Sequence, residues 1–290
     1  MCHAELGFIR HVSGMVDCAL KGLVALQEGR YLMSIRAAFF DVDGTLFSHE
    51  TGVVPESARR ALEQLRERGI IVGVATGRTF GEMQDLPTAD MPFDVYLTMN
   101  GQLILDADGT YIAGNPLTGD ALVNIIRLFD EGKVPVQLFE QNRSYINFVN
   151  ETVEQAQAEI LTPVPKVGTH HGAPLYQADL FVDEAEAERL MPLLQSCDIT
   201  RWNDQAIDVN APSPGGKADG IARFIETQGI QPCEVIAFGD AENDLSMLQF
   251  VGIGVAMGNA TPEAKAAASL VTKAVDDDGV AHALKQLGLM

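Results

Sequence analysis

The sequence predicts an α/β fold, a doubly wound parallel sheet that is interrupted by an inserted α+β domain. From residue 35 onward, short apolar runs alternate with amphipathic helical patterns, and strands that are apolar on both faces are typical of a parallel sheet covered by helices. Between about residues 117 and 209, strand-like runs instead alternate apolar and polar residues, as in Tyr145-Ile146-Asn147-Phe148. That alternation is typical of an antiparallel sheet with one solvent-exposed face.

The expected elements of the parallel domain follow one another in strand–helix order. After a first strand at 35–40, a helix begins near Pro55 and Glu56, because proline and an acid are favoured in a first turn, and Gly69 ends it. Thr261 followed by Pro262 predicts the start of a later Ala-rich helix. The remaining strands of this domain are predicted at 70–75, 95–99, 235–238 and 252–257.

The inserted domain has its own expected order of elements. We predict helices at 120–130, 151–159 and 184–194, a hairpin of strands at 134–139 and 144–149, and strands at 176–182, 198–202 and 206–209. The chain therefore divides into an N-terminal extension at 1–33, a core domain at 34–116 and 210–290, and an inserted domain at 117–209.

The N-terminal extension lies outside the strand–helix pattern. Arg10, Asp17 and Lys21 interrupt its apolar stretches, which argues against a signal peptide. We interpret residues 1–33 as a peripheral, partly helical or disordered segment and Met33 as a candidate translation start.

Composition excludes several kinds of partner. The formal net charge is −20, with 20 Lys and Arg against 40 Asp and Glu, which argues against binding to nucleic acid or to an anionic membrane surface. No apolar segment is long enough to span a bilayer. Because Cys2, Cys18, Cys197 and Cys233 are far apart and show no C-x-x-C spacing, we predict reduced thiols in a cytoplasmic protein.

Two aspartates follow the first predicted strand. Asp41 and Asp43 are two positions apart, so in an extended chain their carboxylates point to the same side, and Gly44 then allows a sharp turn. Two like charges at that spacing repel each other unless a cation lies between them. The pattern predicts a Mg²⁺ site with a carboxylate nucleophile.

Polar residues also follow other predicted strands of the core. Thr76, Asn100 and Asp240 each come directly after an apolar run, and Asn243 and Asp244 follow Asp240 in the same loop. Ligands of open α/β sheets bind beyond the carboxyl ends of the strands. We therefore expect these side chains to converge at one edge of the sheet.

A lysine is expected to join this edge from the chain that follows the insertion. Lys217 stands at the start of a predicted helix, where a cation and the helix N-terminus both favour phosphate. The preceding glycines do not form a nucleotide P-loop, because Ala211 occupies the first glycine position and Ala218 follows the lysine.

Some residues admit two interpretations. Arg78 either faces the substrate or only extends its side chain to solvent, and Asn100-Gly101 is either part of the site or a tight turn. His170 and His171 are predicted to be an exposed pair in a loop.

Together these motifs resemble those of the haloacid dehalogenase superfamily of phosphohydrolases. The DxDGTL segment at 41–46, the strand ending in Thr76-Gly77, the isolated Lys217 and the GDxxND loop at 239–244 occur in the order of the four family motifs. The insertion resembles the large α/β cap of the Cof-type branch. The resemblance covers about residue 35 to the C-terminus and implies a Rossmann-like core with an inserted cap domain.

The resemblance implies the catalytic and metal-binding residues. Asp41 is the expected nucleophile that forms an aspartyl-phosphate, and Asp43 is the expected general acid and base. Mg²⁺ is expected on the Asp41 side chain, the backbone carbonyl of Asp43 and the Asp240 side chain.

The same resemblance implies the residues that bind phosphate. Thr76, the Gly77 amide and Asn243 are expected to hold the phosphoryl oxygens, and Lys217 is expected to neutralise charge on phosphate and nucleophile. Asp244 is expected to orient Lys217 or metal-bound water, with Asn100 and Arg78 in supporting positions.

These residues imply a Mg²⁺-dependent phosphatase that acts on a small phosphorylated metabolite, with a sugar phosphate as the expected substrate. The alternatives are a phosphomutase or phosphotransferase of the same superfamily, a non-catalytic phosphate-binding protein, and a phosphorylated signalling receiver domain, which needs no such insertion. We expect no nucleic-acid or membrane partner and a monomer or weak homodimer.

Overall fold

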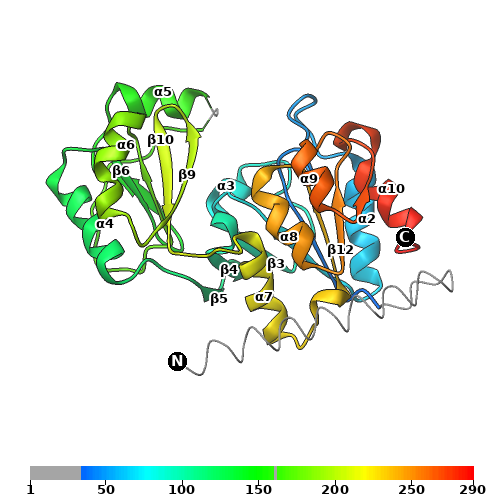
Figure 1. The fold of residues 1–290 in the computed structure, drawn as a ribbon. Helices are drawn as coiled ribbons and strands as arrows, with labels where there is room; N and C mark the ends of the chain where they lie inside the picture. Colours follow the sequence, from blue (N-terminus) through cyan, green and yellow to red (C-terminus); the bar gives the residue numbers. More distant parts are fainter. Residues whose placement is uncertain (1–33, 160–161) are drawn as a thin grey trace. The chain divides into compact units, whose positions relative to one another are not determined.

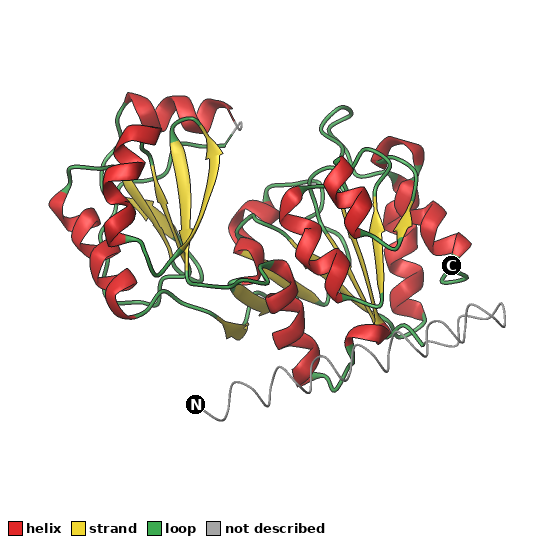
Figure 2. Cartoon of the chain, viewed as in Figure 1, coloured by secondary structure: helices red, strands yellow, loops and turns green. Residues whose placement is uncertain are grey.

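The computed structural model describes residues 34–159 and 162–290 (Figures 1 and 2). The interpretation of residues 1–33 therefore concerns a segment outside the described residues. The chain forms two compact units. Among the described residues, unit 1 consists of 34–75 with Leu86–Val95 and Ile221–Met290, and unit 2 consists of Thr76–Asp85 and the described part of Tyr96–Gly220.

Unit 1 contains a parallel sheet whose strands are the predicted apolar runs. Its strand order is β13-β12-β11-β1-β2, and each neighbouring pair is parallel. The bounds are β1 (Ala37–Phe40), β2 (Ile71–Ala75), β11 (Val235–Gly239), β12 (Ile253–Ala256) and β13 (Leu270–Val271). Every residue of β1 and β11 is buried, which explains why these runs contain no polar residue. The prediction of a parallel α/β core is confirmed.

Helices lie on both sides of this sheet. Figure 1 shows α8 (Leu245–Phe250) and α9 (Pro262–Ala267) on one side, and α2 (Glu56–Glu67) and α10 (Gly279–Gln286) on the other. Right-handed crossovers put α8 and α9 on the side opposite α2. The chain moves along the sheet in one direction from β11 to β12 and in the opposite direction from β1 to β2, so the connecting helices lie on opposite faces. The predicted helix start at Thr261 is confirmed, since its side chain accepts a hydrogen bond of 3.2 Å from the backbone N–H of Ala264.

Unit 2 begins with elements that the sequence analysis placed only in part. β3 (Val95–Thr98) matches the predicted strand, and it is followed by the 3-10 turn η1 (Met99–Gly101). The antiparallel hairpin of β4 (Leu103–Asp106) and β5 (Tyr111–Gly114) and the short helix α3 (Phe80–Gln84) were not predicted. α7 (Lys217–Thr227) begins in unit 2 at the predicted lysine.

The rest of unit 2 is a five-stranded antiparallel sheet with the strand order β7-β6-β8-β10-β9. The strands are β6 (Val136–Phe139), β7 (Ser144–Ile146), β8 (Gln177–Leu180), β9 (Asp198–Asn203) and β10 (Ala206–Asn210). One face packs against α4 (Gly119–Glu131) and α6 (Glu184–Leu190), both of which contribute buried residues to the same cluster (Figure 1). α5 (Glu151–Glu159) packs against a second cluster that contains Phe181 and Ala206.

Two predictions about the inserted domain need correction, one about its sheet and one about a helix. The face that the alternating pattern assigned to solvent is buried at several polar positions, among them Gln137, Gln177 and Asp179. These side chains are partly paired with one another, which lowers the cost of removing them from water. The predicted helix at 184–194 ends at Leu190 and continues as the 3-10 turn η2 (Met191–Leu193), which contains Pro192, because proline lacks the N–H that an α-helix interior requires.

The predictions on membrane segments and cysteines have different outcomes. In the described ranges no helix has both the length and the apolar character that crossing a membrane requires. Cys197 is a free thiol, but Cys233 is disulfide-bonded, so the prediction of a reduced thiol is wrong at Cys233. Cys2 and Cys18 lie outside the described residues.

Candidate active site

Asp41 lies where β1 ends. Its backbone N–H donates to the carbonyl of Phe238 at 2.9 Å and so extends the ladder between β1 and β11 by one residue. The residue is only 5% exposed. A carboxylate at that depth needs a charge partner or hydrogen-bond donors, because burial without compensation disfavours its charged form.

Asp240 occupies the equivalent position after β11, and neighbouring side chains fix its carboxylate. The Thr45 hydroxyl donates to Oδ1 at 3.2 Å, and the amide of Asn259 donates to Oδ2 at 3.4 Å. The same Asn259 amide donates to the carbonyl of Gly44 at 2.8 Å, and its Oδ1 accepts from the N–H of Val275 at 2.9 Å. Asn259 therefore connects Asp240 to two loops.

Gly44 is required at its position for two reasons. Its φ is +83°, a backbone conformation that residues other than glycine rarely adopt. A Cβ placed there would lie 2.3 Å from Oδ2 of Asp240. The glycine of the DxDGTL segment thus leaves room for the Asp240 carboxylate.

Asp244 contributes a third carboxylate from the 3-10 turn η4 (Glu242–Asp244) and is fully buried. Its Oδ2 accepts hydrogen bonds from the backbone N–H groups of Asp240 at 2.8 Å and Ala241 at 3.0 Å. These bonds hold the loop after β11 in a fixed conformation, which also explains Gly239, whose Cβ would lie 2.5 Å from Cγ of Asp244.

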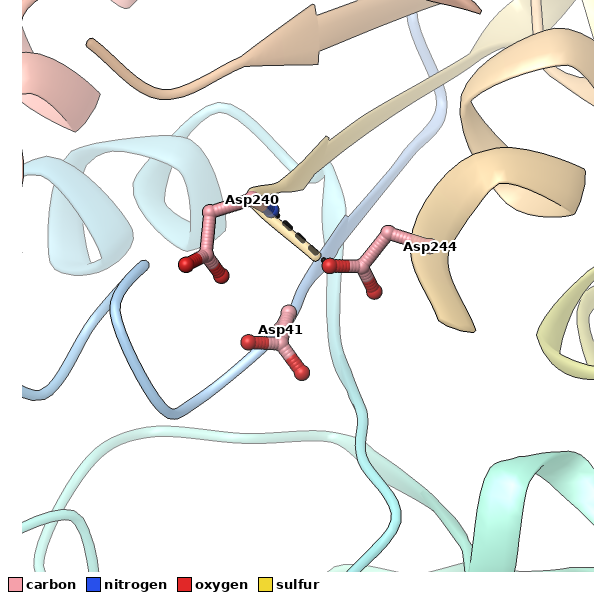
Figure 3. A group of neighbouring side chains, drawn as sticks. All are labelled: Asp41, Asp240 and Asp244. Carbon is pink, nitrogen blue, oxygen red and sulfur yellow. Dashed lines mark hydrogen bonds between the residues drawn. The ribbon is translucent and has the colours of Figure 1, made fainter. Parts of the chain in front are cut away.

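The carboxylates of Asp41, Asp240 and Asp244 point toward a common position (Figure 3). One oxygen of each lies within 4.8 Å of the others, an arrangement suited to a metal ion. Three anionic groups at this separation repel one another, and a bound divalent cation removes that repulsion. The donor set fits Mg²⁺, which prefers carboxylate oxygens at about 2.0–2.1 Å and retains several waters.

Asp43 differs from the three clustered carboxylates. It is partly exposed, and its Oδ1 lies 3.0 Å from Nε2 of His49. Its side chain is not a member of the metal-suited group, and the expectation that its backbone carbonyl binds the ion stays a prediction. The sequence analysis did not identify His49, because no periodicity or motif links it to Asp43.

The predicted phosphate-binding residues Thr76 and Gly77 and the predicted supporting residue Asn100 lie together within unit 2. The carbonyl of Thr76 accepts from the N–H of Asn100 at 2.9 Å, and the Thr76 hydroxyl accepts from the N–H of Arg78 at 3.1 Å. A Cβ on Gly77 would lie 3.5 Å from the Asn100 side-chain amide. Asn100 has φ +53°, a left-handed conformation that asparagine tolerates better than most residues.

Lys217 is the first residue of α7 and is fully buried. The backbone near its helix start approaches the turn that carries Asn100, because a Cβ on Gly101 would lie 3.0 Å from the carbonyl of Gly216. A buried ammonium next to glycines suits a phosphate that requires close backbone approach. Of the other predicted residues, Arg78 is half-buried and Asn243 is exposed in η4.

The structure thus places the predicted residues in two groups. Asp41, Asp240 and Asp244 cluster in unit 1, and Thr76, Asn100 and Lys217 belong to unit 2. Sequence reasoning missed the roles of Thr45 and Asn259. The rule used for the other strands would have found Asn259, since it follows the predicted strand at 252–257 by two residues.

A parallel sheet with helices on both sides (Figure 1) and carboxylates at the ends of its strands is typical of α/β enzymes whose site lies at the carboxyl edge of the sheet. The family model described as haloacid dehalogenase-like hydrolase matches residues 38–284, and the chain belongs to that family.

Relatives with curated names and solved structures agree with this assignment. The chain is 34% identical over 261 residues to a Bacillus subtilis protein named "Putative phosphatase YkrA". The matched region covers 89% of this chain and 100% of the relative. It is 32% identical, with a TM-score of 0.78, to the phosphatase BT1666 of Bacteroides thetaiotaomicron, with 90% of this chain and 98% of that chain covered. It is also 32% identical, with a TM-score of 0.72, to the sugar phosphatase BT4131, with 88% and 100% covered. The protein is a phosphoric monoester hydrolase.

Proposed function

We propose that the protein is a Mg²⁺-dependent phosphatase that hydrolyses a small phosphorylated metabolite, a sugar phosphate, through an aspartyl-phosphate on Asp41. The observation that carries this proposal is the buried Asp41 carboxylate, which shares a metal-suited cluster with Asp240 and Asp244. The similarity to the sugar phosphatase BT4131 supports the choice of substrate class.

The proposed reaction has two steps. In the first, a carboxylate oxygen of Asp41 forms a bond to phosphorus while the bond from phosphorus to the substrate alcohol oxygen breaks, and Asp43 gives its proton to the leaving alcohol. In the second, Asp43 takes a proton from a water whose oxygen attacks phosphorus, and the bond between phosphorus and Asp41 breaks. Inorganic phosphate leaves, and both aspartates return to their starting states.

The remaining residues stabilise charge in this proposal. Asp41, Asp240 and the Asp43 carbonyl would hold Mg²⁺, which supplies positive charge to the phosphoryl oxygens when it is bound. Thr76, the Gly77 amide and Asn243 would bind the phosphoryl oxygens. Since phosphoryl transfer needs little covalent chemistry from the protein, positioning and charge account for most of the rate.

Further assignments complete the proposal. Lys217 would neutralise charge on Asp41 and phosphate, Asp244 would orient Lys217 or a metal-bound water, and Asn100 and Arg78 would support the site. We also propose that residues 117–209 form the cap and that 34–116 and 210–290 form the catalytic core. A cytoplasmic location, the absence of nucleic-acid or membrane partners and a monomeric or weakly dimeric state stay predictions.

The test is a screen of phosphorylated metabolites with Mg²⁺, scored by inorganic phosphate released. Release of phosphate in step with consumption of a sugar monophosphate is the expected result. If phosphate instead moves to another hydroxyl without release, the enzyme is a phosphomutase or phosphotransferase. No change in any phosphorylated compound would contradict catalysis.

A further inference from the structure

The loop that follows Asp43 turns back on itself and returns to this residue. Asp43 and Phe47 form a parallel β-bridge, and the N–H of Gly44 donates to the carbonyl of Phe47 at 2.9 Å. The N–H of Phe47 in turn donates to the carbonyl of Val42 at 2.7 Å. His49, two residues after Phe47, therefore lies beside the Asp43 side chain.

Hydrogen bonds around Ser48 close the far side of the same loop. Ser48 is fully buried, its N–H donates to the carbonyl of Val53 at 3.0 Å, and its own carbonyl accepts from the N–H of Gly52 at 2.9 Å. The Ser48 hydroxyl accepts from the N–H of Thr51 at 3.1 Å. Because the backbone and Ser48 make these bonds, the conformation of the loop does not depend on the His49 side chain.

The His49 ring has two contacts within unit 1. Its Nε2 lies 3.0 Å from Oδ1 of Asp43, and its ring meets the Phe47 ring edge to face, with 5.0 Å between centroids and 79° between planes. A packing contact and a polar contact together restrict the rotamers of the imidazole.

The Asp43 carboxyl group depends on such a restraint more than Asp41 does. The Asp43 side chain is 31% exposed, whereas Asp41 is buried at the end of β1. A group that moves a proton must lie within hydrogen-bond reach of the reacting oxygen, and a small displacement lowers the rate strongly. A third side chain commonly orients the acid or base in sites of this kind.

Stability alone does not account for the pair of His49 and Asp43. The His49 side chain is 62% exposed, and an exposed ion pair contributes only about 0.2–1 kcal/mol. Replacing His49 should therefore leave the protein folded.

Two other histidines make different contacts. Nδ1 of His170 lies 2.9 Å from the Tyr145 hydroxyl, and the His170 side chain is only 10% exposed, so the prediction that it is exposed is wrong. His282 is exposed on α10, with Nδ1 3.3 Å from the hydroxyl of Thr272. The nearest polar contact of each of these rings is a hydroxyl, whereas His49 contacts the carboxyl group of a predicted catalytic residue.

We propose that His49 is a positioning residue for Asp43. Its contact with Oδ1 holds the carboxyl group where it gives a proton to the leaving alcohol and later takes one from water. The proposal rests on the proposed role of Asp43 in the phosphatase reaction, and it adds a residue outside the four motifs.

The first experiment tests that role of Asp43 with phenyl phosphate and p-nitrophenyl phosphate, which have nearly the same shape. p-Nitrophenol is a much stronger acid than phenol, so its anion leaves without a proton, whereas phenol needs one from the enzyme. Since kcat/KM covers the steps up to departure of the alcohol, it reports the acid role without the later base role. Asp43→Asn should lower kcat/KM for phenyl phosphate by about 10²-fold more than for p-nitrophenyl phosphate.

The second experiment changes His49 and measures the same ratio of kcat/KM values, phenyl phosphate to p-nitrophenyl phosphate. His49→Leu should lower this ratio by about tenfold, because a displaced acid affects only the leaving group that needs a proton. His49→Gln keeps an N–H group at about the reach of Nε2, so its ratio should stay within about threefold of that of the unaltered protein. A merely structural role predicts equal losses with both probes, a lower unfolding temperature and no rescue by glutamine.

His282→Leu is the matched control, an exposed histidine of the same unit whose ratio should stay unchanged. The role of His49 alone is overturned if His49→Leu leaves the ratio unchanged while Asp43→Asn lowers it. It is also overturned if His49→Gln loses as much as His49→Leu, or if the control variant loses as much. Equal losses with both probes in Asp43→Asn contradict Asp43 as general acid. Absence of phosphate release from both probes and from the metabolite screen contradicts the proposed function itself.

Discussion

The acidic cluster of unit 1 and the polar face of the antiparallel sheet in unit 2 differ in how their side-chain oxygens are satisfied. We call that face, formed by Gln137, Gln177, Asp179, Asp208 and Asn210, the polar cap face. The carboxylate oxygens of Asp240 accept from Thr45 and Asn259, and Asp244 accepts from two backbone N–H groups. On the polar cap face, the side-chain oxygens of Gln137, Gln177 and Asn210 accept nothing within the described part of the chain. A site whose geometry must be fixed before the reaction is held by the protein's own hydrogen-bond donors, as the Asp240 and Asp244 carboxylates are.

The strongest test of the acidic cluster is Asp41→Asn. An amide oxygen is a poor nucleophile, so phosphate release should fall by at least ~10³-fold while the fold is retained. Phosphate release and the circular dichroism spectrum are measured on the same preparation. Appreciable turnover by a folded variant would refute the role of Asp41 as nucleophile.

Asp240→Asn should have the next largest effect. Removing one negative charge from the cluster weakens Mg²⁺ binding, so the rate at saturating Mg²⁺ should fall by ~10²-fold and the Mg²⁺ concentration at half-maximal rate should rise. Rates are measured across a Mg²⁺ titration and after treatment with EDTA. An unchanged titration curve would show that Asp240 is not a metal ligand.

The same contrast explains which parts could be predicted from the sequence. Asp41, Thr76, Asn100 and Asp240 each follow an apolar run directly, so one local rule finds all of them. The parallel strands of unit 1 were predictable because their burial on both faces leaves an uninterrupted apolar run.

The polar cap face and the partners of the site residues were not predictable in this way. The face exists only because the registers of β6, β8 and β10 align residues up to 73 positions apart, from Gln137 to Asn210, and a single sequence does not record register. The alternating pattern even predicted exposure, because a polar residue on a buried face looks the same in sequence as one in solvent. The hairpin of β4 and β5 was missed because β5 is half-exposed and its residues show no clean alternation.

A pair of glycine substitutions tests how tightly the acidic cluster is fixed. Gly44 and Gly52 both have positive φ, at +83° and +70°, but only Gly44 lies against a side chain, with Oδ2 of Asp240 2.3 Å from its would-be Cβ. Gly52→Ala should cost about 1–2 kcal/mol from backbone strain alone. Gly44→Ala should cost more and should also lower the rate by about tenfold, since the Asp240 carboxylate must move.

Chemical denaturation and phosphate release are measured for both alanine variants. Equal losses of stability, with the rate of Gly44→Ala unchanged, would show that the acidic cluster adapts to displacement. That result would weaken the contrast between the acidic cluster, whose geometry is fixed by hydrogen bonds, and the polar cap face.

The smallest expected effect concerns the pH dependence of stability on the polar cap face. The pKa of Asp179 is raised, chiefly by burial, so the folded state binds its proton more tightly than the unfolded state does. Stability from this group is therefore fully present below the ordinary aspartate pKa of 3.8 and is lost as pH rises toward the folded-state pKa. Asp179→Asn removes that loss, so the unfolding temperature of the variant relative to the unaltered protein should increase as pH rises from 4 to 8.

Glu140→Gln provides a comparison of opposite sign within the same domain. The hydrogen bond from Arg143 is the main cause that lowers the pKa of Glu140, so its contribution is present above the ordinary glutamate pKa and is lost as pH falls through the folded-state value. This variant should be less stable than the unaltered protein at pH 7, with a smaller difference near pH 4. Parallel pH profiles for Asp179→Asn and Glu140→Gln would mean that the protein satisfies both carboxyl groups in the same way, and the contrast between them would be wrong.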